Sequence, residues 1–287
     1  MSSKFSEKKN ILITGSTGLI GSDFLNEYSK KYNIYQIHYK NKKKTFKYNL
    51  SIINNFKKIP DKFEVLIYLA QSNNYNNPKK YKSEILNINY KNFRNLVIKF
   101  NNGKKIKKII YASTGSVYFN KGKILNEGSK IKNLKSDLYS SSKIMAENFL
   151  RNFKGRKFEY FIGRIFFAYG KNQKDNKLFK KLIYKIKSGE QIIINGKSGI
   201  KINPIHSFDV CKIFDKSISL NINGIYNIAG PETMSMKQIC DRISSVLKRK
   251  PNYKFEIKSN SIVGSIKKIN KFYKPKILFK NKINELI

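Results

Sequence analysis

The stretch Asn10-Ile-Leu-Ile-Thr-Gly-Ser-Thr-Gly-Leu-Ile-Gly21 decides the fold of this chain of 287 residues. Its apolar first half is typical of a short buried strand, and an amphipathic helix opens at Leu19. Between them, Gly15, Gly18 and Gly21 let the backbone approach a pyrophosphate, whose charge would meet the free N–H groups at the helix N-terminus. Glycines that only make a tight turn are the plainer alternative. Three of them at a strand–helix junction favour dinucleotide binding.

The next predicted strand, residues 33–39, ends at the position that distinguishes NAD from NADP. In a site for NAD, an acidic residue about twenty residues beyond the glycines holds the ribose 2′-hydroxyl. The sequence instead continues Lys40-Asn-Lys-Lys-Lys44, whose cations are able to accept a 2′-phosphate. NADP is therefore slightly favoured over NAD. Lysine is so frequent in the chain that plain surface charge stays open as an alternative.

Tyr139 and Lys143 lie four residues apart in a segment predicted to be helical, residues 138–147, so they share one face. A neighbouring ammonium and a cationic nicotinamide ring both favour the phenolate. Together they lower the pKa of a tyrosine from its usual ~10 toward the range of a general acid/base. On spacing alone, a helix face with a snorkelling lysine is the stronger alternative.

With further landmarks added, the chain resembles the extended short-chain dehydrogenase/reductases, the NAD(P)-dependent nucleotide-sugar epimerase/dehydratase family, nearly from end to end. The landmarks follow the family's order: Thr14–Gly21 as the TGxxGxxG turn, Glu64–Gln71 as the fourth strand and its following small residue, Asn89 in the next helix, Lys108–Tyr118 as the strand with the catalytic Ser or Thr, Gly163–Gly170 as "RxxNxYG", Pro204–Val210 as "IHVDDV", and Tyr226–Gly230 followed by a helix over 235–239.

The resemblance implies an α/β fold, a doubly wound parallel sheet (Rossmann) with a small C-terminal substrate-binding lobe. We expect residues 1–170 to form the dinucleotide-binding domain, with its sheet completed by residues 201–230. The lobe is expected to comprise residues 171–200 and 231–287. A chain of this length accommodates both parts.

The resemblance also assigns roles to residues. Tyr139 would hold or give the proton, Lys143 would lower its pKa and bond the nicotinamide ribose, and Thr114 would donate to the developing oxyanion. Without the family, Thr114 is a β-branched residue at a strand end. The expected cofactor contacts are Gly15, Thr17, Gly18, Leu19, Ile20, Lys40, Asn49, Leu50, Leu69, Ala70, Gln71, Asn89, Tyr139, Lys143 and Phe166. The expected substrate contacts are Thr114, Gly115, Ser116, Tyr139, Phe167 and His206, and no metal ligands are expected.

Departures from the family pattern narrow the reaction. Asn49 stands where many members have an aspartate near the adenine, and Phe167 replaces the asparagine of "RxxNxYG". Gly115 and Ser116 replace the Asp-Glu pair of the 4,6-dehydratases, so a dehydratase is disfavoured. Epimerisation through transient oxidation, at C4 of a nucleotide-activated sugar, and net reduction by a 4-ketoreductase both remain. NADPH exchanged at each turnover suits reduction, whereas NAD held through the cycle suits epimerisation.

Three other polar residues have two interpretations each. We expect His206 to close a buried hydrogen bond beside Asp209 rather than to act in catalysis. Arg164 is expected either to meet a substrate phosphate or to make a structural ion pair. Glu147 is expected to be solvated or to pair with another helix.

The formal charge of +41 and the pI near 10.1 raise a second hypothesis, nucleic-acid binding. The lysines are dispersed among Asn, Ile, Tyr and Phe, whose codons are rich in A and T, so biased genome composition explains them. No RNA-recognition or helix-turn-helix signature accompanies them. A catalytically silent nucleotide-binding or scaffold protein of the same fold is the third alternative, against which the intact Thr114, Tyr139 and Lys143 argue.

The remaining features concern location and assembly. Residues 2–9 lack the apolar core of a signal peptide, and no apolar run reaches the length of a membrane span. Two cysteines, Cys211 and Cys240, are too few for a disulfide framework or a metal site. We expect a cytoplasmic enzyme of surface polysaccharide synthesis. The resemblance implies a homodimer that pairs through the helices after the fourth and fifth strands.

Overall fold

A seven-stranded sheet forms the centre of the fold. The computed structural model describes residues 7–40, 44–119, 122–257 and 260–287. The strands follow the order β11-β6-β5-β4-β1-β2-β3, and the pairs among β1 to β5 are parallel. Their bounds are β1 Asn10–Thr14, β2 Asn33–His38, β3 Thr45–Lys47, β4 Val65–Tyr68, β5 Lys108–Thr114, β6 Glu159–Ile165 and β11 Gly224–Ile228. The predicted α/β fold with a doubly wound parallel sheet is confirmed.

The chain divides into two compact units. The first comprises residues 1–112, 133–162 and 217–224, and the second comprises residues 113–132, 163–216 and 225–287. The boundary falls inside β5, after Ala112. The predicted division into a dinucleotide-binding domain and a substrate-binding lobe stays a prediction.

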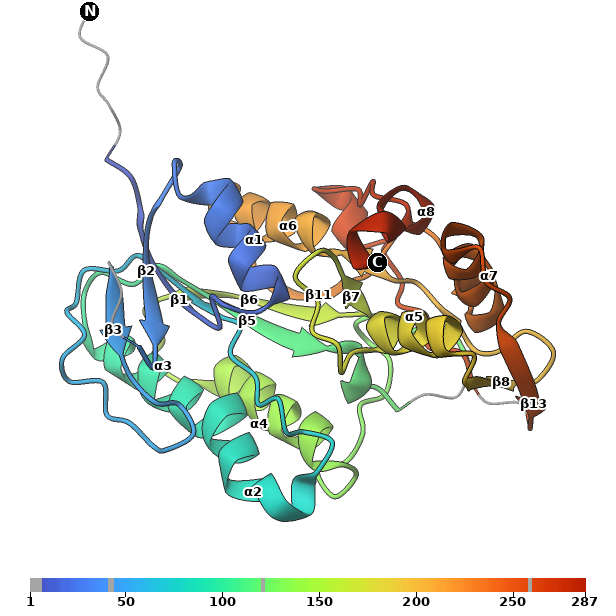
Figure 1. The fold of residues 1–287 in the computed structure, drawn as a ribbon. Helices are drawn as coiled ribbons and strands as arrows, with labels where there is room; N and C mark the ends of the chain where they lie inside the picture. The colour runs from blue at the N-terminus through green and yellow to red at the C-terminus, as the bar shows by residue number, and fades with distance from the viewer. Residues whose placement is uncertain (1–6, 41–43, 120–121, 258–259) are drawn as a thin grey trace, which may run out of the picture. The chain divides into compact units, whose positions relative to one another are not determined.

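In the first unit, helices cover both faces of the strands. They are α1 Leu19–Tyr28, α2 Pro78–Leu86, the π-helical η1 Asn87–Lys91, α3 Asn92–Asn102 and α4 Leu138–Asn152. Figure 1 shows α1 on one face of strands β1 to β5, and α2, α3 and α4 on the other. Apolar side chains on both faces of β1 and β4 are therefore buried. Function is expected at the carboxyl ends of such strands.

The second unit holds shorter elements around a core of its own. Its helices and strands are η2 Gly115–Val117, β7 Ala168–Tyr169, α5 Leu178–Ser188, β8 Gln191–Asn195, β9 Lys201–Ile202, β10 Ile205–His206, α6 Ser207–Ser219 (which ends in the first unit), β12 Met234–Ser235, α7 Met236–Leu247, β13 Asn252–Glu256, η3 Ile269–Lys271, α8 Phe279–Lys282 and η4 Ile283–Leu286. Apolar residues of α5, β8, α7 and α8 form one buried cluster.

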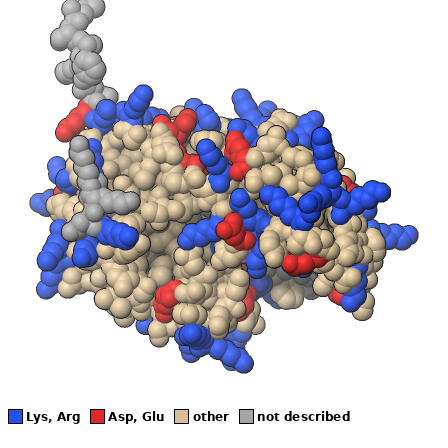
Figure 2. Space-filling view, viewed as in Figure 1, with Lys and Arg blue, Asp and Glu red and all other residues tan. Residues whose placement is uncertain are grey.

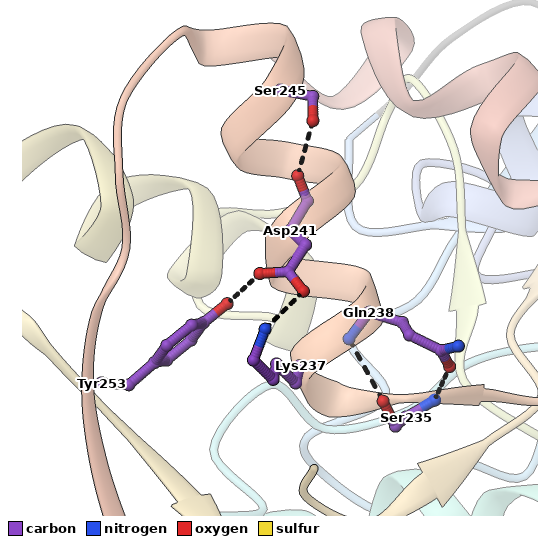
Figure 3. Close-up of polar contacts among 6 residues, drawn as sticks. All are labelled: Ser235, Lys237, Gln238, Asp241, Ser245 and Tyr253. Carbon is purple, nitrogen blue, oxygen red and sulfur yellow. Dashed lines mark hydrogen bonds and ion pairs between the residues drawn. The ribbon is translucent and has the colours of Figure 1, made fainter.

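Helix α7 shows how local sequence sets a boundary in this unit (Figure 3). The Ser235 hydroxyl accepts from the N–H of Gln238 at 3.2 Å, and the Gln238 side chain accepts from the N–H of Ser235 at 2.8 Å. One turn later, Asp241 accepts from the Lys237 ammonium at 2.9 Å and from the Tyr253 hydroxyl at 2.8 Å. Asp241 thus joins α7 to β13. The predicted helix over 235–239 is confirmed, with Ser235 as its cap.

Cationic side chains are spread over the face drawn in Figure 2, among many neutral residues and a few acidic ones. This matches the dispersed lysines of the sequence. Cys211 and Cys240 are both free, buried thiols. Among the described residues, no helix is both long enough and apolar enough to cross a membrane.

Candidate active site

The glycine turn between β1 and α1 has the shape that the sequence predicts. Gly15 has φ +70°, in the left-handed region, and a Cβ there would lie 2.8 Å from the backbone nitrogen of Ala70. A Cβ on Gly21 would strike the carbonyl oxygen of Gly15. The N–H of Gly18 donates to that same oxygen at 3.0 Å. Side chains at positions 15 and 21 would therefore break the turn.

The polar groups of this turn fit an anionic ligand. Gly18 is the N-cap of α1 and makes no side-chain capping bond, and N–H groups at a helix N-terminus are general donors to anions. Ser16 is 2% exposed, and its hydroxyl has no hydrogen-bond partner among the described residues. Thr17 is exposed, and Leu19 and Ile20 are half-buried in the first helical turn. A dinucleotide pyrophosphate would satisfy these donors.

The segment after β4 is fastened beside the turn. The Thr14 hydroxyl oxygen accepts from the N–H groups of Leu69 at 3.2 Å and Ala70 at 3.1 Å. Two residues on, the N–H of Ser72 donates to the side-chain oxygen of Asn89 at 3.2 Å. These bonds place the predicted cofactor contacts after β4 next to the turn that β1 enters.

Lys143 is buried in the first unit. Its side chain is 2% exposed, its Nζ donates to the carbonyl oxygen of Ala112 at 2.8 Å, and it lies 4.9 Å from the ring centre of Tyr111. Burial lowers the pKa of Lys143 to about 7, and the negative charge of Glu147 opposes that shift. A surface-snorkelling lysine is thereby excluded.

Glu147 is 2% exposed, so of its two expected roles the solvated one is wrong, and pairing with another helix stays a prediction. Tyr139, Lys143 and Glu147 follow one another at intervals of four residues along α4, so they share one helix face. This spacing is visible in the sequence and places Glu147 next to Lys143 on that face.

Tyr139 lies half-buried at the start of α4, whose first turn is capped by Asp137. Its hydroxyl donates to the side-chain oxygen of Gln71 at 3.1 Å, and its ring centre lies 4.9 Å from that of Tyr75. The structure therefore brings Tyr139 and Gln71 together, although 68 residues separate them in the chain.

Asn89 connects these parts from inside the π-helical turn η1. Its side-chain nitrogen donates to the Ser142 hydroxyl at 2.9 Å, and its carbonyl oxygen accepts from the Tyr111 hydroxyl at 2.9 Å. The Ser142 hydroxyl in turn donates to the carbonyl oxygen of Tyr139 at 2.8 Å. A π-helical turn at such a place is typical of functional sites. Ser72 and Ser142 were missed by the sequence analysis, since isolated serines carry no pattern.

Three predicted residues lie together in the second unit. Thr114 ends β5, and its hydroxyl oxygen accepts from the N–H of Ser116 at 3.2 Å. Ser116 is exposed, whereas Gly115 is buried. A Cβ on Gly115 would come within 2.6 Å of the Phe166 ring, so a larger residue there would force that ring to shift. Because Thr114 and Tyr139 belong to different units, their partnership stays a prediction.

The two phenylalanines after β6 differ in their backbone. Phe166 is 1% exposed, and its ring fills the space beside Gly115 and Gly264. Phe167 has φ +47°, in the left-handed region that asparagine tolerates better than phenylalanine. This backbone conformation would suit an asparagine, the residue that the family has at this position. Contacts of either residue with cofactor or substrate stay predictions.

His206 and Arg164 both have structural partners. His206 is fully buried, and its Nε2 lies 3.0 Å from a carboxylate oxygen of Glu285. Its neighbour Asp209 instead accepts from the Tyr273 hydroxyl at 2.6 Å. Arg164 is 2% exposed and donates to the carbonyl oxygen of Glu127 at 3.4 Å. These contacts support the structural interpretation of both residues.

On the expected adenosine side, the contacts are sparse. Asn49 and Lys40 are exposed and Leu50 is half-buried. The side-chain oxygen of Asn49 accepts from the N–H of Ser51 at 3.0 Å. Lys42, with its neighbours at 41 and 43, lies outside the described residues.

With the site assembled, comparison with known proteins gives its family. The profile of the NAD dependent epimerase/dehydratase family matches residues 11–229. The chain belongs to the NAD-dependent epimerase/dehydratase family. The match includes the glycine turn, the whole of β5, helix α4 and β11. The predicted resemblance is therefore confirmed.

Solved structures share this family's fold over nearly their whole length. UDP-glucuronic acid 4-epimerase from Bacillus cereus, in complex with UDP-glucuronic acid and NAD, is 20% identical with a TM-score of 0.83, covering 96% of this chain and 97% of that chain. UDP-N-acetylglucosamine 4-epimerase from Methanobrevibacter ruminantium is 22% identical with a TM-score of 0.81 (98% and 97%). UDP-glucose 4-epimerase from Thermus thermophilus, in complex with NAD, is 15% identical with a TM-score of 0.79 (96% and 97%).

Proposed function

We propose that this family member is an NAD-dependent epimerase that inverts C4 of a nucleotide-activated sugar, with Tyr139 as its acid/base. The observation that carries the proposal is the buried Lys143, one helical turn after the half-buried Tyr139 and beside the end of β5. Family membership and the 4-epimerases among the solved relatives support the reaction class. NAD supplies a hydride acceptor and donor at its nicotinamide ring.

Each residue then has a task that its contacts allow. The turn at Gly15 and Gly18 would hold the pyrophosphate against the N-terminus of α1. An ammonium has three donors, and Ala112 takes one from Lys143, which leaves two for a ribose hydroxyl or the Tyr139 oxygen. Tyr139 would take the proton from the sugar hydroxyl and later return it. Thr114 would donate to the same sugar oxygen.

The steric limit at Gly115 supports hydride transfer without elimination. An aspartate there would collide with Phe166, so a 4,6-dehydratase pair does not fit at this position. Between the two remaining reactions, a 4-ketoreductase pairs naturally with exchanged NADPH and an epimerase with retained NAD. Two of the three solved relatives described above contain NAD, and the lysine argument for NADP rests on the exposed Lys40 and on Lys42. We therefore take NAD and epimerisation as the proposal, with NADP-dependent reduction as the competing outcome.

Mass spectrometry of small molecules that co-purify with the protein tests this proposal without assuming a substrate. Retained NAD together with a sugar nucleotide supports the epimerase. Recovered NADP supports the reductase. If neither NAD nor NADP co-purifies, and neither binds on calorimetric titration, the result would instead support the catalytically silent or scaffold alternative.

We also propose a homodimer that forms through the helices after β4 and β5. Half-buried aromatic side chains gather on them. The ring centre of Phe149 lies 6.4 Å from that of Tyr90 and 5.2 Å from that of Phe153. Such an apolar group suits a helix-to-helix interface. We further propose that the enzyme works in the cytoplasm, in polysaccharide synthesis, which uses nucleotide-activated sugars.

A further inference from the structure

The segment after β4, residues 69–75, is held rigidly in the first unit on both sides of Gln71. Before Gln71, two backbone N–H groups are bonded to the Thr14 hydroxyl. After it, the N–H of Ser72 is bonded to the side chain of Asn89. The backbone that carries Gln71 is therefore fixed to β1 and to η1.

A partly buried carboxylate contact closes the other end of this segment. Glu84 of α2 accepts from the Ser72 hydroxyl at 2.6 Å. Both of its oxygens also accept from the side-chain nitrogen of Asn74 at 3.1 Å. Hydrogen bonds to a charged acceptor are stronger than neutral ones. Gln71 thus extends from a segment with little freedom to move, unlike an ordinary surface glutamine.

From this fixed position, Gln71 reaches the hydroxyl of Tyr139. The phenol donates to the glutamine side-chain oxygen at 3.1 Å, and the Tyr75 ring lies 4.9 Å from the Tyr139 ring, centre to centre. We propose that Gln71 is a positioning residue for Tyr139, whose amide oxygen directs the phenol O–H and stabilises the protonated, acid form. The inference rests on the proposed acid/base role of Tyr139.

In the orientation that the structure shows, the amide oxygen accepts from the phenol, and a phenolate cannot make this bond. Gln71 therefore favours the acid form of Tyr139, and a cation beside the tyrosine favours the base form. The other titratable groups near Tyr139 are Tyr111 of β5 and Tyr75, and the same face of α4 carries Lys143 and then Glu147. Burial is the main cause that raises the pKa of Tyr111, and the charge of an ionised Tyr139 raises it further. All of these stay in place when only position 71 is changed.

Two substitutions change the acceptor in opposite directions. Gln71→Met keeps the length of the side chain and removes the acceptor. Gln71→Glu keeps the shape and supplies an acceptor that is charged and never donates when ionised. The full-length protein, labelled with ¹³Cζ-tyrosine and free of cofactor, reports the ionisation of each phenol by NMR. The signal of Tyr139 is the one missing from Tyr139→Phe.

We expect the titration midpoint of Tyr139 to fall by about half to one pH unit in Gln71→Met, as loss of one hydrogen bond predicts. In Gln71→Glu it should rise by at least as much, because a carboxylate also repels the phenolate. Gln191→Met, a change at an exposed position of strand β8, serves as the control and should leave the midpoint unmoved.

Midpoints that agree with the parent protein within about 0.2 pH unit in both Gln71 variants would overturn the proposal; about half a unit is the smallest shift expected from a hydrogen bond. If Gln71→Met does not fold, the isosteric Gln71→Glu decides alone. The titration needs neither substrate nor turnover. Unmoved midpoints in a protein that epimerises sugars would reject only the role of Gln71, whereas moved midpoints in an inactive protein would reject only the enzymatic function.

Discussion

The Nζ of Lys143 donates a 2.8 Å hydrogen bond to the carbonyl oxygen of Ala112. The bond ties α4 to β5 at the end of the first unit's share of that strand. It also holds an ammonium where burial lowers its pKa to about 7. An amine with that pKa changes its charge near neutral pH, so its effect on a neighbouring phenol depends on pH in the working range.

Lys143→Met should alter how stability depends on pH. Lysine in the unfolded chain titrates near 10.5, whereas Lys143 in the folded protein titrates near 7. Between these values the unfolded state binds the extra proton, so the stability of the parent protein rises with pH, and the cost of burying the charge is complete below pH 7. The stability of Lys143→Met relative to the parent should therefore fall by on the order of a few kcal/mol from pH 7 to pH 10.

Denaturant unfolding of the cofactor-free proteins at several pH values measures this difference. The exposed Lys154→Met is the matched control, and its difference from the parent should be constant. Parallel stability curves for Lys143→Met and the parent would show that Lys143 is not buried as a perturbed amine.

Gly115→Asp should destabilise the protein by about 1–3 kcal/mol, the usual cost of overpacking, because its Cβ meets the Phe166 ring. Ser116→Asp places the same charge on the adjacent, exposed residue and should cost far less. Thermal or denaturant unfolding measures both. The double variant Gly115→Asp/Phe166→Leu has a smaller side chain at position 166 and should recover part of the lost stability. Equal stability of the two aspartate variants would contradict the steric account.

Replacing Lys40 and Lys42 with Ala tests the lysines after β2. If they hold a 2′-phosphate, the variant should lose affinity for NADP and keep its affinity for NAD. Calorimetric titration with both dinucleotides gives the ratio, with the exposed Lys57→Ala as the control for general charge. Equal effects on NAD and NADP would identify both lysines as surface charge, as the proposed use of NAD requires.

Phe149→Lys should shift the protein from dimer to monomer, because it places a charge among the aromatic side chains of Tyr90 and Phe153. Asn148→Lys adds the same charge at an exposed position of the same helix and should leave the assembly unchanged. Sedimentation or light scattering measures the mass. A monomeric parent protein would contradict the proposed interface.

The sequence predicts the glycine turn and the strands β1 and β4 because each depends on local chemistry. Gly15 is required by a positive φ, and β1 and β4 are apolar runs long enough for a strand and too short for a buried helix. The Tyr139 and Lys143 pair is found by helical spacing. The burial of Lys143 is not predicted by this spacing, because a snorkelling lysine has the same spacing.

The sequence does not predict the contacts that complete the site, because they join segments that are far apart in the chain. Glu84, Ser72 and Asn89 meet only after α2 folds back beside the end of β4, and no spacing in the chain announces that meeting. Phe167 shows a second limit. The sequence shows its change from the family's asparagine, but it does not show the left-handed backbone conformation of Phe167, with φ +47°.

The central claim is tested most directly by following the hydrogen at C4 of a sugar nucleotide. UDP-glucose, UDP-glucuronic acid and UDP-N-acetylglucosamine, each deuterated at C4, are incubated with the protein and NAD and examined by NMR. We predict that one of them yields its C4 epimer with the deuterium retained, and that Tyr139→Phe, with its affinity for NAD intact, yields none. Inversion with loss of deuterium to water, or equal activity of Tyr139→Phe, would contradict the account.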